Sequence, residues 1–432
     1  MVAGTALLIW AGSGLLHPVM SWTNPRAAAM APPLEAPLTT PAVALADAAR
    51  RQGATTIGYA RLVSQEGETL WQWTPPDRLH WFYASAADGA PRPQADARRA
   101  ELLARHYSGE AAAAVLSAER IDAFDVAYPA VNRLLPVWRV RFDRPDQLTA
   151  YVHTGEDRLA SLNDRRKTVL LMLFQTLHTW HWLDGVEGVR LSLIGLAILS
   201  VLAMAMLGGA LVLLRRQGPM GTRTRRVHRL LAWGVWGPAL MLGVSGLFHL
   251  GMQTSLRRSP PATPPGITLT ALPVLAEAPQ RMSLLVLPEG QGVWRIQHQD
   301  QSRWVDAREG TELALDDAAM AARLAGLPPG TPAEQQMRFS AEYGFANRRL
   351  PVWRLEDGSN RVFVDLASGQ LAGRAGALDV LEQRSFSTLH KWEFLSPIGR
   401  GPRDALLALA ATLLVLTSVI GWRLGRRRGR AL

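Results

Sequence analysis

The sequence predicts a membrane protein in which an α-helical four-span bundle carries two large α+β domains on one side of the bilayer. Three observations support this fold class. The 432-residue chain is 48% hydrophobic and 19% charged, a balance typical of a protein that lies partly in a membrane and partly in water. Four apolar stretches are long enough, or nearly so, to cross a hydrocarbon core of about 30 Å. Two long polar segments separate them, and several short motifs occur twice in the same order.

The four apolar stretches are expected to be transmembrane helices. A spanning helix needs roughly 20 apolar residues, and residues 191–214, 230–250 and 405–422 satisfy this requirement. The stretch 2–20 is marginal, and the small residues at 26–31 would also suit cleavage of a signal peptide. A signal peptide carries basic residues before its apolar core, and none is present here. We therefore expect a retained first span.

Arginine clusters give these spans an orientation. Residues 215–226 and 423–430 are rich in arginine and directly adjoin apolar stretches, and basic residues gather at the cytoplasmic ends of spans. Both termini should then lie in the cytoplasm, with the long polar segments in the periplasm of a bacterial cell. The net charge of +11 is explained by contact with membrane lipid headgroups, so nucleic acid is not an expected partner.

The expected parts of the chain follow from these spans. They are span one (1–22), a periplasmic domain with a Pro/Ala-rich linker (23–166), an apolar segment with span two (167–216), a cytoplasmic loop (217–229), span three (230–251), a second periplasmic domain (252–380), an apolar segment with span four (381–423) and a basic tail (424–432).

Repeated motifs indicate an internal duplication. "SGLLH" (13–17) recurs as "SGLFH" (245–249), "NRLLPVWRV" (132–140) as "NRRLPVWRL" (347–355), and "FQTLHTW" (174–180) as "FSTLHKW" (386–392). Each half has an even number of spans, so the repeats are parallel. Equivalent residues should then lie at equal depth around a pseudo-two-fold axis along the membrane normal.

Both polar segments are expected to be α+β domains. Residues 136–162 and 351–374 alternate apolar and polar side chains around turn residues, which is typical of hairpins. Upstream of them, residues 95–109 and 315–330 carry apolar residues at helical spacing and end at glycine.

A helix followed by "PVWRV…YVHTGE" resembles the PepSY domain. Over nearly the whole chain, the order of elements resembles the PepSY-associated transmembrane family, which includes inner-membrane proteins linked to iron uptake and ferric-siderophore reduction. The resemblance implies two PepSY-like periplasmic domains and one or two non-covalent haem b groups held by histidines. It also implies a ferric siderophore as substrate, with a quinol or a protein as electron donor. The alternative is a non-enzymatic PepSY module that restrains a peptidase or senses the envelope from a membrane anchor.

Six of the ten histidines lie at or near span ends, namely His17, His178, His249, His390, His181 and His228. A single histidine at an interface is usually an ordinary side chain. The first four, however, form two pairs at corresponding positions of the repeat, and ionisable groups beside spans tend to be functional. Following the resemblance, these four are the expected axial ligands of haem iron.

The other two histidines have different expected roles. His181 has Glu393 as its counterpart and is a substitute ligand or a neighbour of the ligands. His228 and His249 lie at opposite ends of span three and would be about 32 Å apart along a helix, so His228 would serve a separate cytoplasmic haem. Family members usually carry a histidine before span one. Either the true start lies upstream of Met1, or that second haem is absent.

Several other residue types fit a haem site less specifically. Glycines could admit a flat ring or close helix packing, tryptophans could flank a porphyrin or form an interfacial belt, and arginines could pair with propionates or simply be solvated. The candidates are Gly12, Gly14, Gly243, Gly246, Trp180, Trp182, Trp392, Arg133, Arg348, Arg165, Arg166 and Arg384.

The composition excludes several other chemistries. Without cysteine there can be no disulfide, thiolate nucleophile, iron–sulfur ligation or covalent haem attachment. The expected spans contain no acidic residue, which disfavours a metal-ion transporter. Motifs of hydrolases, nucleotide-binding loops and nicotinamide or flavin sites are missing from the sequence, so electrons would have to come from another protein or from quinol.

Overall fold

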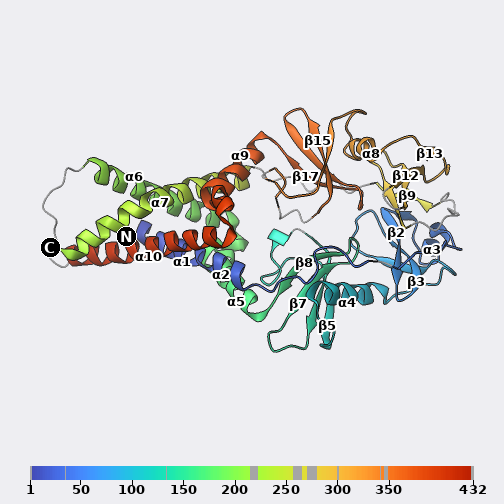
Figure 1. The fold of residues 1–432 in the computed structure, drawn as a ribbon, viewed down its shortest axis with the longest axis horizontal. Coiled ribbons are helices and arrows are strands. Elements are labelled where there is room, and N and C mark those ends of the chain that lie inside the picture. The colour runs from blue at the N-terminus through green and yellow to red at the C-terminus, as the bar shows by residue number, and fades with distance from the viewer. Residues whose placement is uncertain are drawn as a thin grey trace. The chain divides into compact units, whose positions relative to one another are not determined.

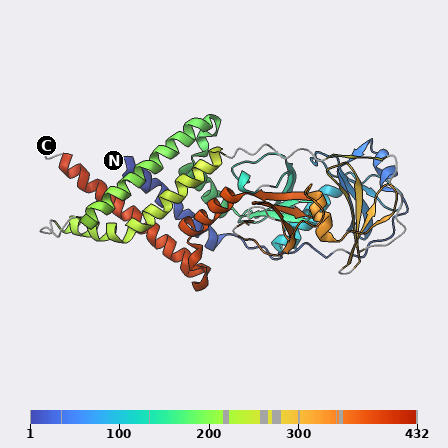
Figure 2. The same cartoon turned by 90° about the horizontal axis from the view of Figure 1, so that it is seen from above.

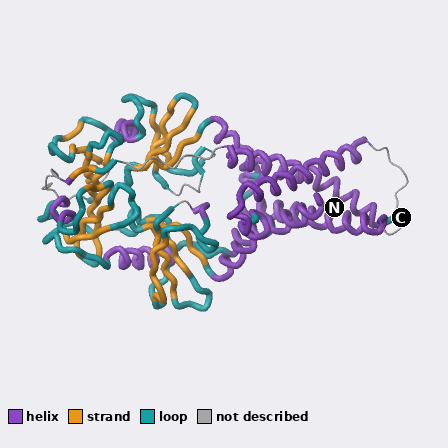
Figure 3. Tube along the Cα trace, turned by 180° about the vertical axis from the view of Figure 1, so that it is seen from behind, coloured by secondary structure: helices purple, strands orange, loops and turns teal. Residues whose placement is uncertain are grey.

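The computed structural model describes residues 2–34, 36–132, 134–214, 222–255, 265–269, 280–298, 301–340, 342–344 and 349–429. The chain divides into two compact units. A helical unit contains Met1–Asn24, Arg166–Ser259 and Leu378–Leu432, and a strand-rich unit contains Pro25–Arg165 and Pro260–Ala377. The described strands all belong to the second unit, and the longest helices belong to the first (Figure 3).

Within the described residues, four helical stretches are long and apolar enough to cross a membrane: Ala3–Thr23, His181–Leu211, Arg223–Met252 and Arg400–Gly425. They are formed by α1 (Val2–Gly14) with α2 (Leu16–Thr23), by α6 (Glu187–Leu214) with the turn before it, by α7 (Arg223–Ser255) and by α10 (Arg400–Gly429). These helices agree with the predicted spans and with a membrane protein.

The four long helices form a closed bundle. Helices α6 and α10 each contact both α1 and α7, and the four lie together in two perpendicular views (Figures 1 and 2). Small residues such as Ala6, Ala205 and Ala239 are buried at the centre beside Val201 and Leu414. Small side chains allow helix backbones to approach closely, which is how helices associate in lipid.

Two irregular segments precede α6 and α10. Helix α5 (Arg165–Phe174) continues into a π-helical turn, η2 (Gln175–Thr179), and then a 3₁₀ segment, η3 (His181–Val186). Helix α9 (Ala377–Ser385) continues likewise into η6 (Phe386–His390) and η7 (Glu393–Ile398). Between the turns of each pair, Trp180 and Trp392 adopt the left-handed conformation, with φ of 53° and 52°.

The strand-rich unit contains a seven-stranded sheet built from both halves of the sequence, in the order β13-β12-β11-β10-β2-β3-β4. Its strands are β2 (Tyr59–Gln65), β3 (Glu68–Thr74), β4 (Phe82–Ser85), β10 (Arg281–Val286), β11 (Gly292–His298), β12 (Gln301–Asp306) and β13 (Glu312–Leu313). The halves join where β10 pairs antiparallel with β2, with Leu284 opposite Ala60. The two polar segments are therefore parts of one compact unit, a union not predicted from either segment alone.

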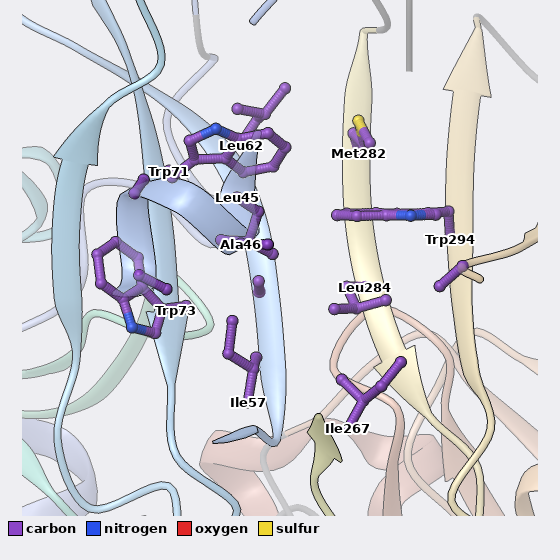
Figure 4. Close-up of a cluster of buried hydrophobic side chains, with 14 of the residues drawn as sticks. Leu45, Ala46, Ile57, Leu62, Trp71, Trp73, Ile267, Met282, Leu284 and Trp294 are labelled. Atoms are coloured by element: carbon purple, nitrogen blue, oxygen red, sulfur yellow. The ribbon is translucent and has the colours of Figure 1, made fainter. Parts of the chain in front are cut away.

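A hydrophobic cluster on this sheet draws on both halves. Trp71 and Trp294 lie 5.9 Å apart between ring centroids, at an interplanar angle of 44°. Leu284 and Ile57 are completely buried beside them (Figure 4). The helix α3 (Leu45–Arg50) and a short bridge between β1 (Thr56–Ile57) and β9 (Ile267–Thr268) complete this region.

Two four-stranded antiparallel sheets complete the unit, in the orders β5-β6-β7-β8 and β14-β15-β16-β17. Their strands are β5 (Val115–Ile121), β6 (Val137–Phe142), β7 (Thr149–His153), β8 (Arg158–Asn163), β14 (Ala333–Gln336), β15 (Val352–Asp357), β16 (Asn360–Asp365) and β17 (Gln370–Ala375), with a 3₁₀ turn η1 (Ala130–Asn132) before β6. Helix α4 (Ala95–Ser108) packs on the first sheet and α8 (Asp317–Leu324) on the second. The predicted hairpins and helices are all present.

Candidate functional site

Four predicted histidines lie together in the helical unit. His17 is on α2, His249 is near the end of α7, and His178 and His390 lie in the two π-helical turns. The charges of His178, His249 and His17 would all act on His390, which places the four in one region. In the described part of the chain, the structure thus gathers residues that range from near the beginning of the sequence to near its end.

Each half contributes one phenylalanine between two histidines. The Phe174 ring stacks on His178 at 4.6 Å between centroids and lies 6.5 Å from His17. We call these three residues the first array.

The second array has the same construction. The Phe386 ring stacks on His390 at 4.7 Å and on His249 at 5.1 Å. Phe174 ends α5 and Phe386 begins η6, and each lies four residues before the histidine on which it stacks. Helical residues at this spacing lie on one face, so the local fold itself sets the stacking.

A buried serine accompanies each array. The Ser13 hydroxyl lies 3.0 Å from His178 Nδ1, and the Trp10 indole donates to the His178 carbonyl at 3.1 Å. Ser245 occupies the position in "SGLFH" that corresponds to Ser13, and it is 1% exposed. Its hydroxyl and His390 Nδ1 are both buried without a hydrogen-bond partner.

A carboxylate holds one ring of the second array. His249 Nδ1 is hydrogen-bonded to the Glu382 carboxylate, whose side chain on α9 is 15% exposed. A carboxylate accepts hydrogen bonds, so Nδ1 of His249 donates this one. The alignment that pairs His178 with His390 places Leu170 opposite Glu382 in the first half.

His178 and His390 lie outside the four membrane-length stretches, and burial keeps both side chains neutral. Burial lowers the pKa of His178 to about 4, and His17 adds to the effect. Burial also lowers the pKa of His390 to about 4, with a further contribution from His178. Neutral imidazole is the form that ligates metals, so both side chains are in the binding-competent state at neutral pH.

These residues fit haem iron. A ligating imidazole normally uses one ring nitrogen for the metal and fixes the other by a hydrogen bond. Ser13 provides that bond to His178, and Glu382 provides it to His249. The Nδ1 atom of His390 is buried and has no hydrogen-bond partner. Across the described ranges, no three His, Asp or Glu side chains gather as a mononuclear metal site would require. Axial haem ligation asks for only one or two histidines at each iron.

The structure places the two remaining histidine candidates differently. His181 follows Trp180 directly, and its Nδ1 is buried without a partner. His228 lies on α7 against Gly421 of α10, where an added Cβ would be 3.0 Å from the His228 ring. His228 is thus part of a helix contact, at the opposite end of α7 from His249.

The glycine candidates fall into two groups. A Cβ added at Gly12 or Gly14 would meet no atom within 4 Å, whereas one at Gly243 would lie 2.7 Å from Leu202. A Cβ at Gly246 would lie 3.7 Å from Ile198, an ordinary contact. Gly12 and Gly14 therefore have open space beside them, whereas Gly243 of α7 allows close packing against Leu202 of α6.

The tryptophan and arginine candidates are spread around the site. Trp180 stacks on Trp10 at 5.8 Å, Trp182 is 62% exposed, and Trp392 is buried. Arg165, Arg166 and Arg384 are exposed. Arg133 and Arg348 lie outside the described residues.

Sequence reasoning missed five residues of this site. Phe174, Phe386, Ser13 and Ser245 are all contained in the repeated motifs, so extending the comparison of the halves beyond histidine would have found them. Glu382 is not in a repeated motif, and its contact with α7 is purely tertiary.

In comparisons with known proteins, the sequence matches no protein-family model and no curated protein. The resemblance to PepSY-associated proteins stays a prediction, as does the duplication.

Proposed function

We propose that this chain is a haem-dependent reductase of the bacterial inner membrane, which reduces ferric siderophores on the periplasmic side. The observation that carries the proposal is the gathering of His17, His178, His249 and His390 in two matching arrays beside the spans. Imidazoles, aromatic rings and apolar helices are the surroundings in which proteins hold b-type haem. When bound, haem supplies reversible one-electron chemistry at its iron.

The residues of the arrays would bind and orient this group. Nε2 of each histidine is the ligating atom where Nδ1 is occupied, as at Ser13 and Glu382. The phenylalanine rings restrict how far the imidazoles can turn. Burial keeps His178 and His390 unprotonated by lowering the pKa of each to about 4. No protein acid or base is required for the transfer of an electron.

The choice of a ferric siderophore as substrate follows from the ligand preferences of Fe(III) and Fe(II). One electron from a quinol or a protein donor converts siderophore-bound Fe(III) to Fe(II). Hard oxygen ligands hold Fe(II) less tightly, and the metal is released. The strand-rich unit, with two PepSY-like halves arising by duplication, would hold the siderophore.

The first test is an absorption spectrum of the full chain, expressed with ample haem supply and purified in detergent. We expect a Soret band and, after reduction with dithionite, a sharp b-type α band. Pyridine haemochrome analysis should give one or two haems per chain. His178→Ala and His390→Ala should each lose haem, whereas His106→Ala in the strand-rich unit should not.

The outcomes separate the two functional readings. Folded protein without a Soret band would contradict the reductase and favour a non-enzymatic PepSY module on a membrane anchor. If haem is present, adding ferric desferrioxamine B to the reduced protein should reoxidise the α band and release Fe(II) to a ferrous chelator. A reduced spectrum that does not respond to ferric siderophores would remove the substrate from the proposal.

A further inference from the structure

The two arrays are alike in their rings but unlike in charge. In the second array Glu382 binds His249 directly, while the first array has Leu170 at the equivalent position. His178 of the first array shares its hydrogen bond with the neutral Ser13 hydroxyl. The second array therefore has a carboxylate hydrogen-bonded to one of its histidines, where the first array has a leucine at the equivalent position.

A carboxylate on the far nitrogen changes what a histidine does to a metal. It fixes the ring orientation and makes the imidazole a more basic ligand. More electron density at Nε2, together with a nearby negative charge, stabilises the more positive, oxidised iron. The iron so ligated has the lower reduction potential.

Other charges near the arrays do not repeat this contact. The buried Asp404 acts on His17 of the first array, but it is paired with Arg403 at 2.8 Å and with Arg400 at 3.9 Å. Lys391 lies 5.2 Å from the Phe386 ring centroid, and its charge acts on both His17 and His390. It therefore influences both arrays. Glu382, in contrast, touches one ligand of one array.

We propose that Glu382 is a positioning residue that gives the iron held by His249 a lower reduction potential than the iron held by His17. This inference rests on the proposed haem function. With haem held by both arrays, the difference in potential would favour transfer of one electron from the iron of the second array to that of the first, with no proton or further reactant needed. The asymmetry thus gives electron transfer between two related sites a direction.

The test is a potentiometric titration of the α band of the full chain in detergent. Wild type should titrate in two waves. In Glu382→Gln, which keeps the side-chain shape and an acceptor oxygen but removes the charge, the lower wave should move up towards the unchanged higher wave. Asp184→Asn is the matched control, because this carboxylate is 62% exposed and pairs with Arg190; both waves should stay in place.

A second variant tests the same idea from the other side. Leu170→Glu places a carboxylate at the equivalent position of the first array and should lower the higher wave. If Glu382→Gln fails to bind haem, Leu170→Glu still shows whether a carboxylate at this position lowers the reduction potential. Wild type with a single wave, or unchanged potentials in both variants, would overturn the role of Glu382 while leaving haem binding intact. A missing Soret band, by contrast, would remove the proposed function itself.

Discussion

Asp157, in the turn between β7 and β8, is a buried carboxylate that two arginines hold in the charged form. Arg99 of α4 binds it with two nitrogens, at 2.6 and 2.7 Å, and Arg61 of β2 lies 2.7 Å away. Burial alone would raise the pKa of Asp157, but Arg61 and Arg99 hold it well below the ordinary value. This one side chain therefore ties the first four-stranded sheet to α4 and to the seven-stranded sheet.

Replacing Asp157 with Asn should destabilise the strand-rich unit strongly. The change leaves two buried guanidinium groups without a counter-charge, and breaking a buried ion pair costs about 3–5 kcal/mol. The Tm of the full chain in detergent, followed by tryptophan fluorescence, should fall on the order of 10 °C. Glu66→Gln is the control, because Glu66 and Arg98 form an exposed pair and such pairs contribute about 0–1 kcal/mol.

The same carboxylate should make the unit sensitive to acid. Since the folded pKa is depressed, the stabilisation is complete above the unfolded pKa of about 4 and decreases as the pH falls towards the folded pKa. The difference in Tm between wild type and Asp157→Asn should therefore shrink below about pH 4. A difference that stayed constant with pH would mean that the charge of Asp157 is not what stabilises the turn.

At the scale of elements, α6 and α7 pack where a glycine faces a large ring. A Cβ added at Gly209 would lie 2.1 Å from the Trp236 indole nitrogen, whereas one at the neighbouring Gly208 would meet nothing within 4 Å. The indole is rigid, so it cannot yield as a flexible chain end would. Gly208 should therefore tolerate a side chain, and Gly209 should not.

Gly209→Ala should loosen the contact between α6 and α7, while Gly208→Ala should be harmless. Overpacking costs about 1–3 kcal/mol, and alanine recovers about 0.5–1 kcal/mol of helix preference over glycine at either position. Thermal aggregation in detergent should begin at a lower temperature for Gly209→Ala only. Equal behaviour of the two variants would show that the helices are not packed through Gly209.

Local elements were predictable, but their long-range pairing was not. The spans, the hairpins and the helices α4 and α8 have apolar periodicity and turn residues that operate over a few positions. The seven-stranded sheet lacks such signals, because β3 is buried along almost its whole length and does not alternate. Its joining pair, Leu284 and Ala60, comes from opposite halves of the sequence, with the second and third spans between them.

The residues of the candidate site were also only partly predictable from the sequence. The four histidines could be predicted because they occupy repeated motifs, whereas Glu382 could not. On α9 this residue has the sequence context of an ordinary surface acid, and only the packing of α7 shows its partner. A contact that depends on tertiary structure leaves no local pattern in one sequence.

At the scale of the whole molecule, the distribution of arginine predicts orientation. Because the chain has no cysteine, single cysteines can be labelled without background. In spheroplasts, a membrane-impermeant maleimide should label Leu116→Cys and Met337→Cys, both exposed in the strand-rich unit. Thr222→Cys, beside the basic loop, should be labelled only after lysis, because basic loops stay in the cytoplasm. The reverse pattern would invert the proposed topology.

The joining of β2 to β10 has a consequence for synthesis on the ribosome. In the proposed topology, residues 59–65 are exported before the strand that will cover their edge has been translated, and two spans must be inserted before that strand arrives. An uncovered strand edge is a template for wrong pairing, and contacts between distant residues form slowly. In that topology the first polar segment stays partly assembled until β10 is made, and during this interval envelope chaperones and proteases would act on the nascent chain.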